Sequence, residues 1–497
     1  MNRKLLRIIS TIILIIIVVT ASPLGVYAAD TVPYDSYTYD YWEYIVFTPA
    51  PYIPGETISG ATLGIGALND PQGIFVAHDD SVYVADTGNN RIIILEPDLF
   101  TVRSVITTFN NNGSSDSFNR PRGVTVDTNG IVYIADTENR RVIALDGTEV
   151  IRVIENPQSE MLGEGFDFVP LKVTVDFAGR VFVIARNMFQ GIMTFNAEGD
   201  FIGFYGTINV SITLWQRFWR ALSTQEQRAR QHLFIPTEFT GLDVDPAGFV
   251  YASNIDRAGE QAVRRLNPNG EDVLRRGENE HVGGDILTWP MHPSPFSGPS
   301  NIIDVTYRGN GMYSLLDSRR GRIFTYDHEG NLLYVFGGMG QQAGTFRQPT
   351  AIAAQENRVI ALDAVRNEII TFSNTLYGEL INKAVSLRYD GDEALAVETW
   401  REVLKLNENF ELANAGIGKA YLAAGDNRTA MHYLRLGMDR HHYSIAFRRW
   451  RNDLLKDNIG WILTFAVGGI FGYVVVRSVV RRRRGNTDVD EGGAFDA

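Results

Sequence analysis

Three aspartates recur at corresponding points of an internal repeat and could help to hold a divalent cation. Asp127, Asp176 and Asp245 each end a short apolar segment, and Asn254 and Asp304 lie nearby in the pattern. Carboxylate and amide oxygens are the ligands that Ca²⁺ prefers in proteins, so Asp127, Asp176, Asp245 and Asn254 could form a calcium centre that activates water. A residue that recurs in copy after copy usually serves the copy itself, since Asp stabilises a turn by accepting its own backbone N–H groups. We favour this structural role and keep the metal site as the alternative.

Other kinds of catalytic chemistry find little support in the sequence. A zinc centre needs three imidazoles that converge on one point, and of the eight histidines only His78 lies on an expected inner strand. The chain has no cysteine, which removes thiol catalysis and cysteine-bound metals. It also lacks a Gly-rich phosphate loop and the Gly-x-Ser-x-Gly and His-Glu-x-x-His motifs. We therefore expect no cofactor, with Ca²⁺ only under the alternative interpretation.

Aromatic residues gather where two copies of the repeat are longer than the others. The third and fourth copies span 66 and 63 residues, against 50 for the first. One insert places Trp215, Phe218 and Trp219 on one side of a short amphipathic helix, and the other holds Trp289 and His292 in a proline-rich loop. The helix could pack over neighbouring copies, but Trp is also a frequent anchor at protein interfaces. These five residues are our candidates for binding a partner.

The repeat itself consists of short apolar strands separated by turns. Six copies lie between residues 70 and 372, and the clearest begin Pro71-Gln-Gly-Ile-Phe-Val and Pro121-Arg-Gly-Val-Thr-Val. Short strands bounded by Gly, Asn and Asp predict antiparallel four-stranded sheets, and radial repetition of such sheets closes a ring. Within each of the first two copies, an aspartate is expected to pair with an arginine: Asp86 with Arg91, and Asp136 with Arg141.

The pattern Pro-x-Gly-Ile-x-Val, followed by Val-Tyr-Val-Ala-Asp-Thr-x-Asn-x-Arg-Ile, resembles the NHL repeat family of six-bladed β-propellers. The resemblance covers roughly residues 41–373 and implies an all-β six-bladed propeller. The sixth copy lacks an outer strand, and either Tyr44–Thr48 or Glu56–Ser59 is expected to supply it, so that an N-terminal strand closes the last blade. Propellers of this family include binding proteins and enzymes, so the resemblance alone does not choose between these roles.

The spacing becomes helical after the propeller. Residues 376–440 repeat at an interval of 34, with Gly391-Asp392 matching Gly425-Asp426, and they resemble about two tetratricopeptide repeats. Residues 441–458 form a basic helix with one apolar stripe, which we expect to cap the repeats; a place on the membrane surface is the alternative. The predicted fold is an all-β propeller, a small all-α domain and one transmembrane helix.

Both ends of the chain carry signals for export and membrane anchoring. Residues 1–29 have the basic start, apolar core and small-residue cleavage site of a signal peptide. Residues 459–480 are apolar and long enough to cross a bilayer as a helix, and Gly468 and Gly472 have the spacing of a helix-dimerisation motif. These signals predict a single-pass cell-membrane protein with its ectodomain outside and residues 481–497 in the cytoplasm.

Charge and architecture together narrow the expected function. The net charge of −12 is concentrated in the exported part, so nucleic acid is not an expected partner. We expect a binding or scaffolding protein that contacts other proteins of the cell envelope, without catalysis of its own. A homodimer through Gly468 and Gly472 is an option that we do not favour, because a single motif of this kind is common by chance. The alternatives are a metal-dependent hydrolase of the lactonase type in the propeller channel and a receptor for carbohydrate or cell-wall polymers.

Overall fold

The computed structural model describes residues 32–162, 165–207, 238–256, 261–276, 282–285 and 298–487. They fall into two compact units, of which the first ends at Asp392 and the second begins at Glu393. The described part of the first unit is dominated by β-strands, whereas that of the second is helical. The expected signal peptide and the end of the expected cytoplasmic tail lie outside the described residues.

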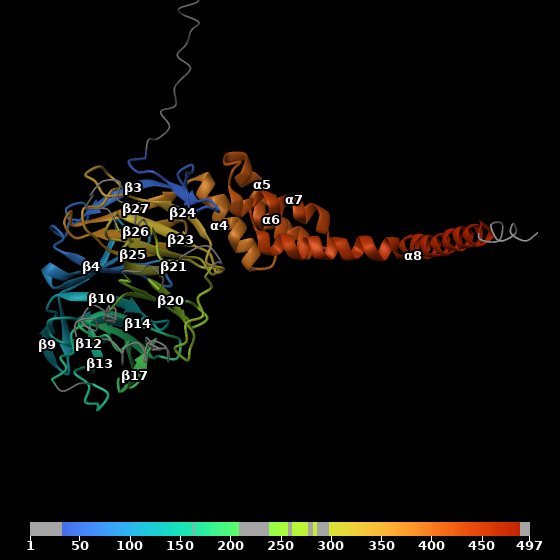
Figure 1. The fold of residues 1–497 in the computed structure, drawn as a ribbon. Helices are drawn as coiled ribbons and strands as arrows, with labels where there is room; N and C mark the ends of the chain where they lie inside the picture. The colour runs from blue at the N-terminus through green and yellow to red at the C-terminus, as the bar shows by residue number, and fades with distance from the viewer. Residues whose placement is uncertain are drawn as a thin grey trace, which may run out of the picture. The chain divides into compact units, whose positions relative to one another are not determined.

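Six sheets form the first unit, one for each copy of the repeat, which confirms the six-bladed propeller (Figure 1). The inner strands are β4 (Pro71–Val76), β10 (Pro121–Val126), β14 (Pro170–Val175), β18 (Phe239–Val244), β21 (Ile302–Tyr307) and β25 (Pro349–Gln355). The second strands are β5 (Val82–Asp86), β11 (Val132–Asp136), β15 (Val181–Ala185), β19 (Val250–Asn254), β22 (Tyr313–Asp317) and β26 (Arg358–Asp363). The third strands are β6 (Arg91–Leu95), β12 (Arg141–Asp146), β16 (Ile192–Phe195), β20 (Val263–Leu266), β23 (Arg322–Tyr326) and β27 (Glu368–Asn374). The described outer strands are β7 (Val102–Ile106), β13 (Glu149–Ile154), β17 (Phe201–Tyr205) and β24 (Leu332–Phe336), and β8 (Thr108–Asn111) and β9 (Ser114–Ser117) extend the second blade.

The core lies between neighbouring blades. Successive side chains of a strand point to opposite faces of its sheet, so each strand of a blade can contact the blades on both sides. Between the last and first blades, for example, Ile74 and Val84 pack with Ile360 and Leu362. The second strands are buried along their whole length in five blades, and in the sixth only the first residue of β26, Arg358, is partly exposed. Burial on both faces explains why these strands are nearly continuous runs of β-branched and other apolar residues.

Every inner strand contains the same β-bulge after its first residue. In the first blade, Pro71 pairs with Asp86 while Gly73 pairs with Ala85, so Gln72 is the extra residue. The same register shift occurs in the five other blades. A bulge bends the strand and re-aims the side chains that follow it. The third residue of each inner strand therefore occupies an equivalent position in all six blades.

The N-terminal segment completes two blades. Strand β3 (Tyr52–Ser59) pairs with β27 as the outer strand of the last blade, and in Figure 1 it lies beside β27. Of the two segments that the sequence offered for this place, Glu56–Ser59 therefore occupies it. The other contributes β2 (Ile45–Phe47), which pairs with β1 (Tyr37–Tyr39) at the outer edge of the fifth blade.

Helix α4 (Leu376–Tyr389) belongs to the first unit and docks on the propeller. Its Asn382 donates to the hydroxyl of Tyr52 at 3.2 Å and accepts from the hydroxyl of Tyr334 at 2.6 Å. Arg308 donates to both hydroxyls. This network joins the first helix of the expected tetratricopeptide-like region to the fifth and sixth blades, so that region is divided between the two units.

The second unit contains α5 (Glu393–Leu406), α6 (Glu411–Ala423), α7 (Asn427–Leu436) and α8 (Arg440–Thr487). Helices α5 and α7 begin 34 residues apart, in agreement with the spacing found in the sequence. Gly416 and Gly418 lie against Trp400 and Leu434, and a Cβ added at either glycine would come within 2.7 Å of these side chains. The small residues thus allow close helix packing, while membership of the tetratricopeptide family stays a prediction.

Helix α8 joins the two C-terminal segments that the sequence separated, residues 441–458 and 459–480. Near its start, Ala446 packs with Leu422 and Leu434, and Asp453 accepts from Asn427 at 3.0 Å; the capping role stays a prediction. Its later apolar side chains are exposed, for example Phe465 at 76%. By length and composition, α8 is a candidate membrane span.

Candidate functional site

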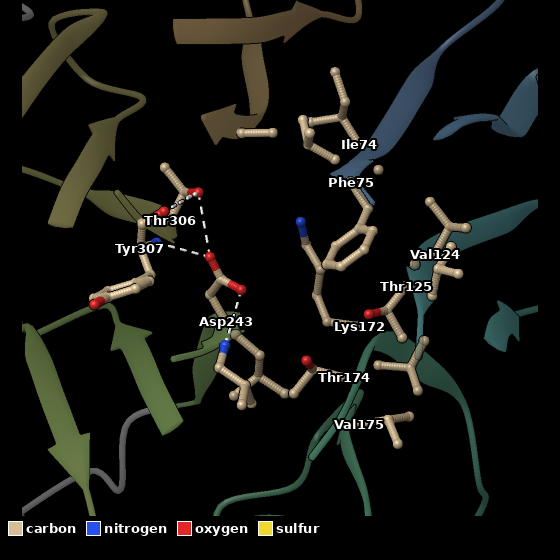
Figure 2. Close-up of a pocket in the computed structure, with 18 of the residues that line it drawn as sticks. Ile74, Phe75, Val124, Thr125, Lys172, Thr174, Val175, Asp243, Thr306 and Tyr307 are labelled. Carbon is tan, nitrogen blue, oxygen red and sulfur yellow. Dashed lines mark hydrogen bonds between the residues drawn. The ribbon is translucent and has the colours of Figure 1, made fainter. Parts of the chain in front are cut away.

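The described propeller has a central cavity of about 220 Å³, and residues of all six inner strands line it. Figure 2 shows the side chains of Phe75, Lys172, Asp243 and Thr306 around this space. The charged and titratable lining residues are His78, Asp127, Lys172, Asp176, Asp243, Asp304 and Tyr307. Carboxylates therefore outnumber cations in the lining, and the hydroxyls of several threonines add hydrogen-bonding groups.

The third position of the inner strand is small in four blades and charged in two. It is Gly73, Gly123, Gly241 and Ala351 in the first, second, fourth and sixth blades. The glycines are needed because neighbouring inner strands approach closely: a Cβ at Gly73 would lie 2.1 Å from the carbonyl oxygen of Arg122. In the third and fifth blades the equivalent residues are Lys172 and Asp304.

These two exceptions form an ion pair. The Nζ of Lys172 lies 3.0 Å from Oδ2 of Asp304, and the same oxygen accepts the backbone N–H of Ile352 at 3.1 Å. Burial raises the pKa of the Asp304 carboxyl, and the ammonium of Lys172 opposes this rise. Gly241 leaves the space that the pair needs, since a Cβ there would lie 2.4 Å from Oδ1 of Asp304. The ammonium group is thus held at a fixed place in the cavity wall.

Asp243 is a second fixed charge in the same cavity. Its Oδ2 accepts the backbone N–H of Tyr307 at 2.7 Å and the hydroxyl of Thr306 at 3.2 Å, and its Oδ1 accepts the N–H of Val244 at 2.8 Å (Figure 2). Burial raises the pKa of Asp243 to about 6, and the nearby Asp304 carboxylate also raises it. A carboxyl with this pKa changes charge close to neutral pH and can accept or release a proton there.

The aspartates that the sequence singled out as alternative metal ligands hold turns. Asp127, Asp176 and Asp245 each accept, on Oδ1, the backbone N–H groups of the second and fourth residues after them. Asp176 and Asp245 also pair with arginines, at 2.7 and 2.8 Å, and Asn254 donates to a backbone carbonyl. Asp127 and Asp176 line the cavity, whereas Asp245 and Asn254 do not.

These four residues therefore do not form one set of metal ligands. Among the described residues, no group of three or more His, Asp or Glu side chains is placed to hold a metal ion. His78, the histidine expected on an inner strand, lines the cavity and is exposed. The five candidate partner-binding residues, Trp215, Phe218, Trp219, Trp289 and His292, lie outside the described residues.

Sequence reasoning missed Lys172, Asp243 and Thr306 as site residues. Asp304 appeared only as a neighbour of the recurring carboxylates. The signal was present, because a position that is Gly in the clearest copies becomes Lys or Asp in two others. It could be recognised only once the bulge had shown which residues are equivalent.

Comparison with known proteins supports the repeat. The NHL repeat model matches residues 118–144, which include β10 and β11. No curated protein sequence matches the chain significantly. Similar solved structures include virginiamycin B lyase from Staphylococcus aureus, with 11% identity, coverage of 65% of this chain and 100% of the lyase, and a TM-score of 0.40. Others are a candidate gluconolactonase (14% identity, 66% and 94% coverage, TM-score 0.38) and Kuenenia stuttgartiensis hydrazine synthase (10% identity, 62% and 96% coverage, TM-score 0.36).

Proposed function

We propose that this chain, which carries an NHL repeat in the second of six propeller blades, is a membrane-anchored binding protein. Its propeller takes a small ligand in the central cavity, and its helical repeats and the inserts of the third and fourth blades contact other proteins of the cell envelope. It acts outside the cytoplasmic membrane, and α8 anchors it there.

One observation carries the binding role: the charges in the cavity that break the repeat are already fixed in place. Lys172 is held by Asp304, and Asp243 is held by three hydrogen bonds. Groups that are ordered before a ligand arrives lose little entropy when it binds, which favours affinity. The recurring carboxylates of the turns, in contrast, are occupied by their own blades.

The membrane location rests on two features of the chain. The apolar stretch of α8 is exposed and long enough to cross a bilayer. The basic and apolar start of the sequence has the form of a signal for export. An exported N-terminal part with a C-terminal span leaves the propeller outside the membrane.

Crosslinking in intact cells tests the binding role. The full-length chain should be crosslinked reproducibly to the same envelope proteins, and Trp215→Ala combined with Trp219→Ala should abolish this capture. Trp42→Ala is the matched control, since Trp42 is an aromatic residue with 62% exposure elsewhere in the ectodomain, and it should leave capture unchanged. The proposal fails if the purified chain instead contains stoichiometric calcium or zinc, loses thermal stability on chelation and hydrolyses lactones only with that metal.

A further inference from the structure

We propose that the central cavity binds a small organic cation, a molecule with a primary ammonium group, and that Asp243 anchors its charge. The inference rests on the proposed binding function and names the ligand class of the same cavity. Four features of the cavity carry it: its charge balance, the geometry of Asp243, the character of its walls and its size.

The charge balance leaves Asp243 without a compensating cation. Lys172 and Asp304 neutralise each other, Asp176 is paired with Arg180, and Oδ1 of Asp127 is occupied by two N–H groups of its own turn. Asp243 receives only neutral donors, namely two backbone N–H groups and one hydroxyl. Asp243 is partly buried, and a carboxylate that is withdrawn from water without a cation costs free energy. A ligand that supplies a positive charge at this place would recover part of that free energy on binding.

The geometry of Asp243 leaves room for a further hydrogen bond. Two donors reach Oδ2, whereas Oδ1 receives only the N–H of Val244. A carboxylate oxygen can accept more than one hydrogen bond. In Figure 2 the carboxylate lies among the side chains that surround the cavity, so Oδ1 can accept an N–H from a ligand there.

The walls of the cavity suit an ammonium group better than a metal ion. Ca²⁺ takes six to eight oxygen ligands, and the described residues hold no cluster that provides them. An ammonium group needs about three acceptors, which one carboxylate and the hydroxyls of Thr174 and Thr306 can supply. Ile74, Val124 and the ring of Phe75 also line the cavity. The face of an aromatic ring attracts a cation, and these apolar side chains can also contact the methylene groups of an alkylammonium ion.

The size of the cavity suits a ligand that is smaller than a drug molecule. Pockets for drug-sized ligands have volumes of about 300–1,000 Å³, and this cavity has about 220 Å³. A short alkylammonium ion fits this limit, whereas a polymer could enter only with one end group. We therefore use n-butylammonium as the probe and 1-butanol, which has a similar shape and no charge, as the neutral comparison.

Calorimetric titration of the full chain in detergent micelles, at pH 7.5 and constant ionic strength, tests the proposal. n-Butylammonium should bind saturably, and 1-butanol should bind at least tenfold more weakly. Asp243→Asn should weaken n-butylammonium binding at least tenfold. Asp98→Asn, which changes a carboxylate in a turn outside the cavity, should leave it unchanged. Asp243→Ser is a second variant that removes the charge, and the melting temperature of each variant without ligand shows that it is folded.

The pH dependence provides a second readout. Three titratable groups that line the cavity lie around Asp243: Asp304 and Tyr307 on β21 and Lys172 on β14. A fourth group is Tyr251 on β19, which lies opposite Asp243 in the register of the sheet. Burial raises the pKa values of both tyrosines, so they stay neutral. Affinity for n-butylammonium should fall as the pH drops through about 6, where Asp243 takes up a proton. The pKa of Asp304 is also raised, so Asp243→Asn serves as the control. If the charge of Asp243 causes the fall in affinity, the pH dependence should be much weaker in this variant.

The failures of the two proposals can be told apart. If Asp243→Asn binds n-butylammonium like the wild type, or if 1-butanol binds equally well, the ammonium proposal is wrong. The binding function still stands in that case if envelope proteins are captured in a Trp215- and Trp219-dependent way. Loss of this capture, together with metal-dependent hydrolysis, overturns both.

Discussion

Lys172 and Asp304 form an ion pair across the central cavity, although 132 residues separate them in sequence. They occupy equivalent positions of the third and fifth inner strands, and the fourth strand, which lies between these two in the ring, has Gly241 at this position. The pair therefore depends on three blades at once: two supply the charges, and the third supplies the space.

Breaking this pair should destabilise the propeller. Asp304→Ala should lower the free energy of unfolding by about 3 kcal/mol, because it leaves the mostly buried ammonium of Lys172 without a carboxylate. The double change Lys172→Ala and Asp304→Ala should cost about 1–3 kcal/mol less than the sum of the single changes. It gives the third and fifth blades the alanine that the sixth blade has at the same position, Ala351. Chemical denaturation measures these values. Glu96→Ala breaks an exposed pair with Arg103 and should cost less than about 1 kcal/mol. Additive effects of the two cavity changes would show that the pair is not coupled.

Asp243→Asn should stabilise the protein at pH 7.5 and not at pH 4. The carboxyl of Asp243 has a pKa of about 6 in the folded chain, above the value of about 3.9 of an unfolded chain. It therefore binds its proton more tightly in the folded state, and its contribution to stability is lost as the pH rises from about 4 to 6. Removing the charge should recover about 3 kcal/mol above pH 6, at about 1.4 kcal/mol for each pKa unit. Denaturation of variant and wild type at several pH values measures the difference, and a constant difference between pH 4 and 7.5 would contradict the raised pKa.

Removing the closing strand should weaken the whole ring. Deletion of residues 30–60 takes away β3 and leaves β27 as an unprotected edge. Hydrogen exchange should become faster in β25 and also in β4 of the adjacent first blade, since the two strands pack on each other. Deletion of residues 30–48, which removes only β1 and β2, should speed exchange mainly in the fifth blade. Unchanged exchange in β4 after the longer deletion would show that β3 stabilises only its own blade and is not needed to close the ring.

Tyr52→Phe should loosen the attachment of α4. The hydroxyl of Tyr52 accepts from Asn382 and Arg308. Its loss leaves these partly buried donors with fewer partners, at a cost of about 1–3 kcal/mol. Thermal denaturation should show the change. Tyr44→Phe is the control, because Tyr44 is 71% exposed, and it should alter stability by less than about 0.5 kcal/mol. Equal effects of the two changes would argue against the network.

Protease added to intact cells should digest the ectodomain and spare a tag at the C-terminus. The predicted signal peptide exports the N-terminal part, and the apolar stretch of α8 stops transfer of the chain. Immunoblotting for the tag should show a shortened, membrane-bound fragment. An ectodomain that is digested only after the cells are broken would reverse the predicted orientation.

The turn aspartates and their arginines could be predicted because their interactions are local. Asp86 pairs with Arg91 and Asp136 with Arg141, as the sequence indicated. Such pairs lie within one blade, between residues five positions apart, and they occur in the first and second copies. The closing strand was less certain, since two apolar segments had strand character. Only the register of β3 with β27 showed which one completes the last blade.

The sequence by itself determined the propeller, because a strand pattern that recurs six times can bury both faces of each sheet only when the sheets pack around an axis. It also determined the helical region and the candidate membrane span, whose periods and composition are local properties. The tertiary structure alone decided where the charges of the cavity meet. Lys172, Asp243 and Asp304 lie on three different inner strands, and only closure of the ring brings these strands to a common axis.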